Sequence, residues 1–284
     1  MSRRVRCPVE RRDSICLVKW AARRPLRVAR YAALAEVSLA GKRSVHVSDS
    51  TPHVSRRYTE RDHEFRDHDR YAGSKNHVTL RWLSGENRGS RLFNIGCGNG
   101  VFNGQAAAAG FEVTAFEPDP DAFRIAAATA PPHCSVEQRT LAEIDGESVA
   151  DVIVMHDVLE HIEDDHAAVR RLRRLLRPGG QLILSVPALP SLFGMHDEEL
   201  GHCRRYTRKS LRAALSPTFR IRRLRYFGMW AVPVVFWYSR YRRRPYPYSR
   251  VEQEGLAAQC LGLVCRIEER IPVPIGTSLI CAAD

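Results

Sequence analysis

Two short segments of this chain concentrate side chains that can move protons or hold a metal. The first runs from His156 to His161 and reads H-D-V-L-E-H. The second, G-M-H-D-E-E-L-G-H-C-R-R-Y-T, contains His196, Asp197 and His202. Imidazole and carboxylate groups are common general acids and bases, and together they also bind divalent metals. Each segment could equally be a hydrogen-bonded loop, so its chemistry depends on what positions it.

The first segment has the spacing of a helical turn. In such a turn His156 would lie beside Glu160, and Asp157 beside His161. His161 could then serve as a base, or Asp157, Glu160 and His161 could hold a metal. In the plainer alternative Glu160 and His161 only cap the loop. We expect no bound metal and take four residues as catalytic candidates: His161, His196, Asp197 and His202.

A glycine-rich turn precedes both segments. The chain reads R-L-F-N-I-G-C-G-N-G from Arg91 to Gly100, and a single carboxylate, Glu117, closes the next apolar run. Glycines after a buried strand allow a tight turn and close approach of a ligand, and a carboxylate at the next strand end can accept hydrogen bonds from ribose hydroxyls. A dinucleotide site would need a third glycine at Val101, so the spacing disfavours a nicotinamide oxidoreductase.

Alternating apolar runs and helical patterns must position these residues. Apolar strands are predicted up to the glycine turn, over residues 111–116, over Asp151–His156 and over Gln181–Val186. Residues 164–177 have helical spacing, with Asp164 or Asp165 able to cap the start and Pro178-Gly179-Gly180 to stop the helix. The alternation predicts an α/β fold, a Rossmann-like doubly wound, mostly parallel sheet with helices on both faces.

These pieces together resemble one enzyme family. The N-I-G-C-G-N-G turn, Glu117, D-V-I-V-M-H-D-V-L-E-H and L-L-R-P-G-G-Q-L-I-L-S-V-P are similar to the motifs of class I S-adenosylmethionine-dependent methyltransferases. The resemblance points to the group that includes ubiquinone-biosynthesis O-methyltransferases, and it extends loosely to Thr277-Ser-Leu-Ile as the last strand. It implies a seven-stranded sheet and S-adenosyl-L-methionine as the cofactor. Some relatives in this group hold a divalent metal in an acidic-and-histidine cluster.

The resemblance also implies which residues contact the cofactor. They are Asn94, Gly96, Cys97, Gly98, Gly100, Glu117, Pro118, Leu141, His156 and Asp157. The chain departs from the family at two places: Asn94 stands where an acidic residue is usual, and Arg139 or Thr140 stands where an acidic residue often meets the adenine.

Composition and the resemblance together divide the chain into three parts. Residues 1–57 are rich in arginine, and we expect a basic, disordered extension. Residues 58–90 are expected to form a helical cap over the cofactor, with Tyr71 and Lys75 able to contact it. Residues 91–284 are expected to form the methyltransferase domain, with a substrate lid at 187–215 and an apolar and basic segment at 226–244. A helix is expected over residues 249–270.

Charge is unevenly placed along the chain, whose formal net charge is +12. Residues 1–90 hold 20 basic and 10 acidic side chains, residues 91–186 hold 8 and 14, and residues 187–284 hold 16 and 8. A basic surface favours nucleic acid. No nucleic-acid-binding module is recognisable, and the resemblance implies a small-molecule acceptor that is methylated on a hydroxyl oxygen. A nucleic-acid methyltransferase and a non-catalytic cofactor-binding protein are the alternatives.

Two further features bear on location and partners. The eight cysteines are scattered without a C-x-x-C pair, which fits a reducing compartment and predicts a cytoplasmic protein. Residues 226–238 are nearly all apolar and precede several arginines, but they are too few to span a bilayer, which needs about 20 residues. This segment could contact a membrane peripherally, cover a pocket for an apolar substrate, or join two copies of the chain. A monomer and a homodimer both remain open.

Overall fold

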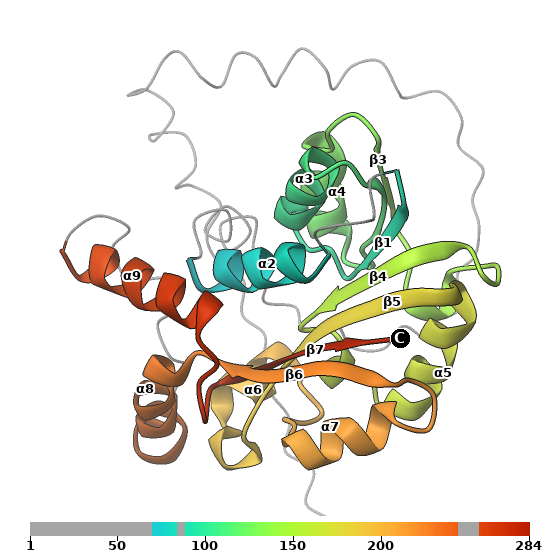
Figure 1. Ribbon diagram of the computed structural model, residues 1–284. Helices are drawn as coiled ribbons and strands as arrows, with labels where there is room; N and C mark the ends of the chain where they lie inside the picture. Colours follow the sequence, from blue (N-terminus) through green and yellow to red (C-terminus); the bar gives the residue numbers. More distant parts are fainter. Residues whose placement is uncertain (1–69, 84–88, 244–255) are drawn as a thin grey trace, which may run out of the picture. The chain divides into compact units, whose positions relative to one another are not determined.

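A seven-stranded sheet organises the part of the chain that the structure describes, which comprises residues 70–83, 89–243 and 256–284. In this computed structural model the strand order is β3-β2-β1-β4-β5-β7-β6 (Figure 1). β7 runs antiparallel to its neighbours β5 and β6, whereas the pairs among β1 to β5 are parallel. The strands are β1 (Arg91–Ile95), β2 (Glu112–Phe116), β3 (Cys134–Glu137), β4 (Ala150–His156), β5 (Leu176–Pro187), β6 (Ile221–Phe227) and β7 (Ser278–Ala283).

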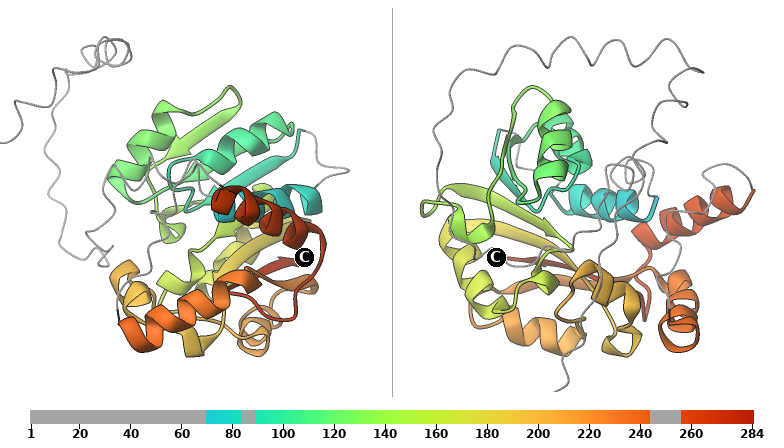
Figure 2. Two further views of the ribbon diagram at one scale, coloured as in Figure 1. Left: turned by 90° about the vertical axis from the view of Figure 1, so that its left-hand side faces the viewer. Right: turned by 180° about the vertical axis from the view of Figure 1, so that it is seen from behind.

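Helices cover both faces of the sheet (Figure 2). Alternate residues of β4 point to opposite faces, so Ile153 and Met155 pack in one core cluster, and Val152 and Val154 in another. α5 and α7 contribute apolar residues to the first cluster, and α2 and α3 contribute to the second. The helices are α2 (Arg70–Leu83), α3 (Val101–Ala108), α4 (Pro120–Ala128), α5 (Asp165–Leu175), α6 (Met195–Leu200), α7 (Arg208–Leu215), α8 (Val232–Trp237) and α9 (Leu256–Arg270). The predicted doubly wound fold is confirmed.

Several short helical turns connect these elements. They are the 3₁₀ helices η3 (Leu141–Glu143), η4 (Leu159–His161), η5 (Pro190–Leu192) and η6 (Met229–Ala231), and the π-helical turn η7 (Tyr238–Arg242). The apolar run 226–238 is therefore divided among the end of β6, η6, α8 and the first residue of η7.

Two predicted boundaries differ from the structure. The helix predicted over 164–177 is α5, which starts with Asp164 as its N-cap and ends at Leu175. β5 begins at Leu176 instead of Gln181, because Leu176 already pairs with Ala150 of β4. The register shifts between Ala150 and Val152, and this irregularity accommodates the Pro-Gly-Gly turn within the strand.

The N-terminal cap is described only as α2, which lies over the carboxyl ends of the central strands. The Tyr71 hydroxyl donates to Ser278 Oγ at 2.9 Å, and Thr79 Oγ1 lies 2.9 Å from His156 Nε2. Val78 and Leu83 of α2 are buried. The extension predicted at residues 1–57 lies outside the described residues, as do 58–69, 84–88 and the first part of the helix predicted over 249–270.

Candidate active site

The glycine turn joins β1 to α3 at the carboxyl edge of the sheet. Gly96, Gly98 and Gly100 all have positive φ, at 69°, 58° and 85°. The turn lies against the end of β2, because the Gly96 and Cys97 amides donate to the Phe116 carbonyl at 2.8 and 3.1 Å. A side chain at Gly96 would meet Val158, since an added Cβ would lie 2.3 Å from Val158 Cγ2. The sequence therefore needs glycine here for both backbone conformation and packing.

Glu117 stands beside this turn, as its place at the end of β2 predicts. Its Oε2 accepts a hydrogen bond of 2.7 Å from the Gly98 amide, and its Oε1 accepts one of 3.0 Å from the Asp119 amide. Two bonds to backbone amides hold the carboxylate in one orientation at the turn. The predicted role toward ribose hydroxyls requires a carboxylate fixed at this place.

The other residues predicted to line the cofactor site near the turn are either half-buried or buried. Pro118 is half-buried next to Glu117, and Cys97 is half-buried in the turn, where burial raises the pKa of its thiol to about 12. Asn94 and Leu141 are buried. The Asn94 amide donates to Asn103 Oδ1 of α3 at 2.7 Å, so this side chain ties β1 to α3 beneath the turn.

The helical turn predicted from His156 onward is wrong. β4 continues through His156, and Asp157 then takes a left-handed conformation with φ 53° before η4 begins at Leu159. Consequently His156 does not pair with Glu160, and Asp157 does not pair with His161. Their partners come from elsewhere: Thr79 of α2 contacts His156, while Lys75 of α2 forms an ion pair with Asp157.

Lys75 sets the electrostatics at the end of β4. Burial opposes ionisation of Asp157, but the Lys75 ammonium outweighs it and lowers the pKa of this carboxyl to about 2. Ser185 of β5 also donates to Asp157 Oδ1 at 3.0 Å. Burial, aided by the charge of Lys75, lowers the pKa of His156 to about 4. Near neutral pH the strand end thus carries an ionised Asp157 and a neutral His156.

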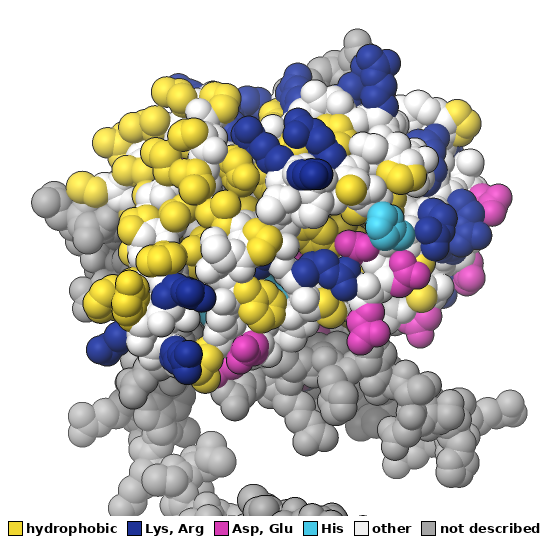
Figure 3. Space-filling model, turned by 90° about the horizontal axis from the view of Figure 1, so that it is seen from below, with side chains coloured by type: hydrophobic (Ala, Val, Ile, Leu, Met, Phe, Trp, Pro, Cys, Tyr) yellow, Lys and Arg dark blue, Asp and Glu magenta, His cyan; other side chains and the backbone are white. Residues whose placement is uncertain are grey.

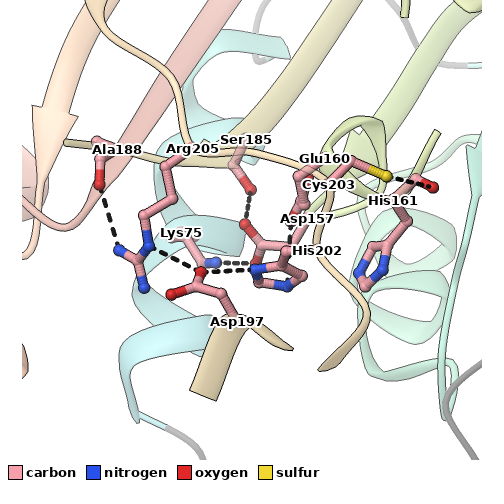
Figure 4. A network of polar contacts seen from close by, with 10 residues as sticks. All are labelled: Lys75, Asp157, Glu160, His161, Ser185, Ala188, Asp197, His202, Cys203 and Arg205. Carbon is pink, nitrogen blue, oxygen red and sulfur yellow. Dashed lines mark hydrogen bonds and ion pairs between the residues drawn. The ribbon is translucent and has the colours of Figure 1, made fainter. Parts of the chain in front are cut away.

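The second predicted segment forms a buried network around Asp197 in α6 (Figure 4). Asp197 Oδ1 accepts from Arg205 Nε at 2.7 Å and from His202 Nδ1 at 2.8 Å, and Oδ2 accepts from the Gly194 amide at 3.0 Å. Burial opposes ionisation of Asp197, but His202 and Arg205 hold its pKa below the ordinary value. Arg205 Nη1 also donates to the Ala188 carbonyl at 3.2 Å, which fixes the segment against the end of β5.

The two predicted segments meet at Glu160. This side chain is fully buried, and neither carboxylate oxygen has a hydrogen-bond partner among the residues that the structure describes. His202 Nε2 lies 4.0 Å from Glu160 Oε1, and the rings of His161 and His202 pack edge to face with centroids 4.7 Å apart. Burial, reinforced by the charge of Asp157, raises the pKa of Glu160 well above its ordinary value.

The four catalytic candidates differ in their suitability as a base. His202 is oriented through Nδ1 by Asp197, so its Nε2 is the nitrogen directed toward Glu160. His161 is exposed beside it. Burial lowers the pKa of His196 to about 4, which is poorly matched to proton removal near neutral pH. Sequence reasoning placed His196, Asp197 and His202 together but missed the meeting of His202 with Glu160, because the two come from different loops.

The donor atoms of Glu160, His161 and His202 also fit a metal ion. They lie within 4.8 Å of one another, and the buried carboxylate needs a partner. One carboxylate and two imidazoles are a donor set typical of zinc or another transition metal, whereas magnesium prefers oxygen ligands. Asp157, the third ligand considered in the sequence, is instead held by Lys75.

Comparison with known proteins assigns the fold and the glycine turn to one family. A sequence model described as a methyltransferase domain matches residues 63–217, which is more than half of the chain. The chain belongs to this methyltransferase family. Its fold is that of the class I, S-adenosylmethionine-dependent methyltransferases, so S-adenosyl-L-methionine is the expected cofactor. The glycine turn, Glu117 and Asp157 are the residues that we expect to hold this cofactor.

Curated relatives match a part of the chain. A ubiquinone biosynthesis O-methyltransferase of Xanthomonas oryzae pv. oryzae (strain PXO99A) is 29% identical over 102 residues, covering 34% of this chain and 43% of the relative. One of Bradyrhizobium sp. (strain ORS 278) is 33% identical over 116 residues, covering 39% of this chain and 44% of the relative. The match thus spans less than half the length of either relative.

Solved structures share the fold over more of the chain. An S-adenosylmethionine-dependent methyltransferase of Mesorhizobium loti has a TM-score of 0.53 at 18% identity, covering 75% of this chain and 99% of that one. Phosphoethanolamine N-methyltransferase 2 of Haemonchus contortus, in complex with S-adenosyl-L-methionine, has a TM-score of 0.54 at 15% identity, covering 80% and 57%. At these identities the likeness shows the fold alone.

Proposed function

We propose that this protein transfers a methyl group from S-adenosyl-L-methionine to a hydroxyl oxygen of a small molecule, with His202 as the base. The observation that carries the proposal is the Asp197–His202 pair, 2.8 Å apart, which directs Nε2 toward Glu160. A carboxylate that accepts from Nδ1 fixes the tautomer in which Nε2 can take a proton. The names of the curated relatives support oxygen as the methylated atom.

The reaction balances with these groups. The bond between sulfur and the methyl carbon breaks, its electron pair stays on sulfur, and the acceptor oxygen forms the new bond to carbon. The hydroxyl proton passes to His202 Nε2, and Asp197 stabilises the imidazolium that results. Holding both reactants in line contributes about 7–11 kcal/mol to lowering the barrier. A positioned base adds a factor of about 10²–10⁴.

A metal at Glu160, His161 and His202 is a second role for the same residues. It is favoured by the buried Glu160 carboxylate, which has no hydrogen-bond partner within the described ranges. A bound metal would supply a Lewis acid that lowers the pKa of an acceptor hydroxyl. His202 would then be a ligand and would be unable to act as the base. A chelator distinguishes the two roles, because it should abolish activity only if these residues hold a metal.

The test measures release of S-adenosylhomocysteine with a panel of catechols, alcohols and amines. His202→Ala should lower turnover about 10²–10⁴-fold while sparing S-adenosylmethionine affinity. His166→Ala, which removes an exposed histidine on α5, is the matched control and should turn over normally. Normal turnover by His202→Ala would exclude the base. Loss of activity with chelator, restored by one divalent metal, would replace the base with a metal site.

The acceptor class is tested by the same panel. This fold serves many acceptors, so the methylated atom has to be determined by experiment. Methylation of amines alone would show that oxygen is the wrong atom. Salt-dependent binding to RNA or DNA would favour the nucleic-acid alternative. We also propose a cytoplasmic location, supported by the free thiols of the cysteines in the described ranges.

A further inference from the structure

α9 has its apolar and polar faces reversed relative to an ordinary surface helix. Its outward face carries Leu263, Val264 and Ile267, and Ile271 continues the stripe beyond the helix end, with exposed fractions of 55%, 37%, 48% and 59%. At 3.6 residues per turn these side chains share an arc of about 100°. The inward face carries Glu268 and Glu269, which are buried. A helix that turns its apolar stripe to solvent presents a contact surface.

The inward carboxylates are used in anchoring the helix. Glu268 accepts hydrogen bonds from the Gly228 and Met229 amides at 2.6 and 3.1 Å. Glu269 pairs with Arg81 of α2 at 3.4 Å. Neither carboxylate is therefore available to the outward face, whose exposed charged residues are Arg266 and Arg270.

A second apolar segment starts at the same anchor. From Met229 the chain runs through α8 and η7 and exposes Phe236, Trp237 and Tyr241 at 42%, 53% and 66%. The rings of Trp237 and Tyr241 stack with centroids 5.0 Å apart. Exposed arginines follow at once, at positions 240, 242 and 243. Figure 3 views the molecule from the side on which α8 lies and shows apolar side chains gathered there, with Lys and Arg at the margin.

The two segments lie at the same end of the sheet. α8 and α9 appear together in both Figure 1 and the rear view of Figure 2. The contacts of Glu268 with Gly228 and Met229 join the end of α9 to the start of the α8 segment. Arg225 of β6 strengthens the junction by donating to the Glu269 and Ile271 carbonyls at 3.1 and 2.9 Å. We call the exposed apolar and arginine side chains of α8, η7 and α9 the apolar–arginine face.

Charge decides which partner fits this face. Residues 229–243 contain three arginines and no acidic residue, and both acidic residues of α9 are buried. A second copy placed by two-fold symmetry would bring arginines against arginines, which is unfavourable. An anionic bilayer suits the pattern, because aromatic rings favour the membrane interface and arginines reach the phosphates. None of the helices in the described ranges is long and apolar enough to cross a bilayer, so the contact would be at its surface.

We propose that the apolar–arginine face docks this protein on the surface of an anionic lipid bilayer. Apolar side chains of α8 and α9 enter the headgroup boundary, and the flanking arginines pair with lipid phosphates. η6 and α8 pack directly on the lid region, since Ala231 of η6 and Val235 of α8 form a cluster with Leu192 of η5. Docking would therefore place the lid region near the bilayer. The proposal does not depend on the identity of the acceptor.

The test is co-sedimentation of the full chain with vesicles. Vesicles of phosphatidylcholine mixed with phosphatidylglycerol should bind the protein, and vesicles of phosphatidylcholine alone should bind it far less. Trp237→Ser combined with Ile267→Gln should weaken binding about tenfold or more, because both side chains would enter the boundary. Arg242→Gln combined with Arg243→Gln should do the same at low salt. The matched control is Arg170→Gln with Arg174→Gln, two exposed arginines of α5, and it should bind like the wild type.

Melting temperature and S-adenosylhomocysteine affinity check that each variant is folded. Two results would overturn the proposal. In the first, the Trp237→Ser/Ile267→Gln variant binds mixed vesicles as tightly as the wild type, which would assign binding to another basic region. In the second, the wild type is a dimer by light scattering, this variant is a monomer, and neither binds vesicles. The face would then join two copies of the chain.

Discussion

Gly96 is the position at which the glycine turn is most sensitive to substitution. Gly96→Ala demands two adjustments. An alanine at φ 69° costs about 1–2 kcal/mol, because its Cβ crowds the backbone in the left-handed region. The Cβ would also lie 2.3 Å from Val158 Cγ2, so Val158 must move, at about 1–3 kcal/mol. The expected loss in free energy of unfolding is about 2–5 kcal/mol.

Two further variants separate these adjustments. Gly104→Ala is the control, since an added Cβ there meets nothing within 4 Å and the residue lies inside α3. It should stabilise the protein by about 0.5–1 kcal/mol. Val158→Ala in the Gly96→Ala background should recover the packing part alone, so a double-mutant cycle should show a coupling of about 1–3 kcal/mol.

Urea unfolding and calorimetry with S-adenosylmethionine are the assays. The shifted turn should also weaken cofactor binding, because Gly96 and Cys97 pack on β2 through their amides. The reasoning fails if Gly96→Ala unfolds at the wild-type urea concentration. It also fails in part if the coupling with Val158 is zero, since the contact between the turn and the loop after β4 would then be unimportant.

Three other predictions concern charged groups. Glu117→Ala should weaken S-adenosylmethionine binding ten- to a hundred-fold by calorimetry, because a charge-assisted bond contributes about 1.5–3 kcal/mol; unchanged affinity would remove Glu117 from the site. Arg205→Met should cost about 3–5 kcal/mol in urea unfolding, because it leaves Asp197 buried without its cation. The control Arg222→Met breaks an exposed pair with Asp284 and should cost at most about 1 kcal/mol. Equal losses in free energy of unfolding for the two variants would contradict the expectation that the buried ion pair is the more costly one to break. The pKa of His156 is about 4 in the folded protein and about 6.5 unfolded, so the unfolded chain binds more protons and stability should fall by up to about 3 kcal/mol as pH drops from 6.5 to 4. His156→Gln should flatten this part of the pH profile, and a profile unchanged by the substitution would exclude His156 as the cause.

The central strands β1, β2, β4 and β5 could be predicted from the sequence because each has its own local pattern. The apolar run of β4 and the amphipathic spacing of α5 are readable without any knowledge of partners. Glycines that follow a strand identify the turn, and a carboxylate at the end of the next strand identifies Glu117. These signals are local and arise from backbone geometry.

The segment after β4 could not be read in the same way. Its spacing suits a helical turn, yet Asp157 is left-handed, a conformation that is uncommon for a non-glycine residue and that contacts with its surroundings favour here. Lys75 and Ser185 supply those surroundings from α2 and β5. Neither contact has a signal in the sequence near Asp157. For the same reason the meeting of Glu160 with His202 depends on where two separate loops lie.

Asp157 and Glu160 show how this arrangement would serve the proposed reaction. The Lys75 ammonium lowers the pKa of Asp157, so this carboxylate keeps a negative charge at the end of β4. Burial and that same charge raise the pKa of Glu160, which favours its neutral form. A neutral Glu160 contributes no charge to an ion pair with the imidazolium that forms when His202 Nε2 accepts the hydroxyl proton. In the proposed reaction that charge is therefore stabilised by Asp197, which accepts the hydrogen bond from His202 Nδ1.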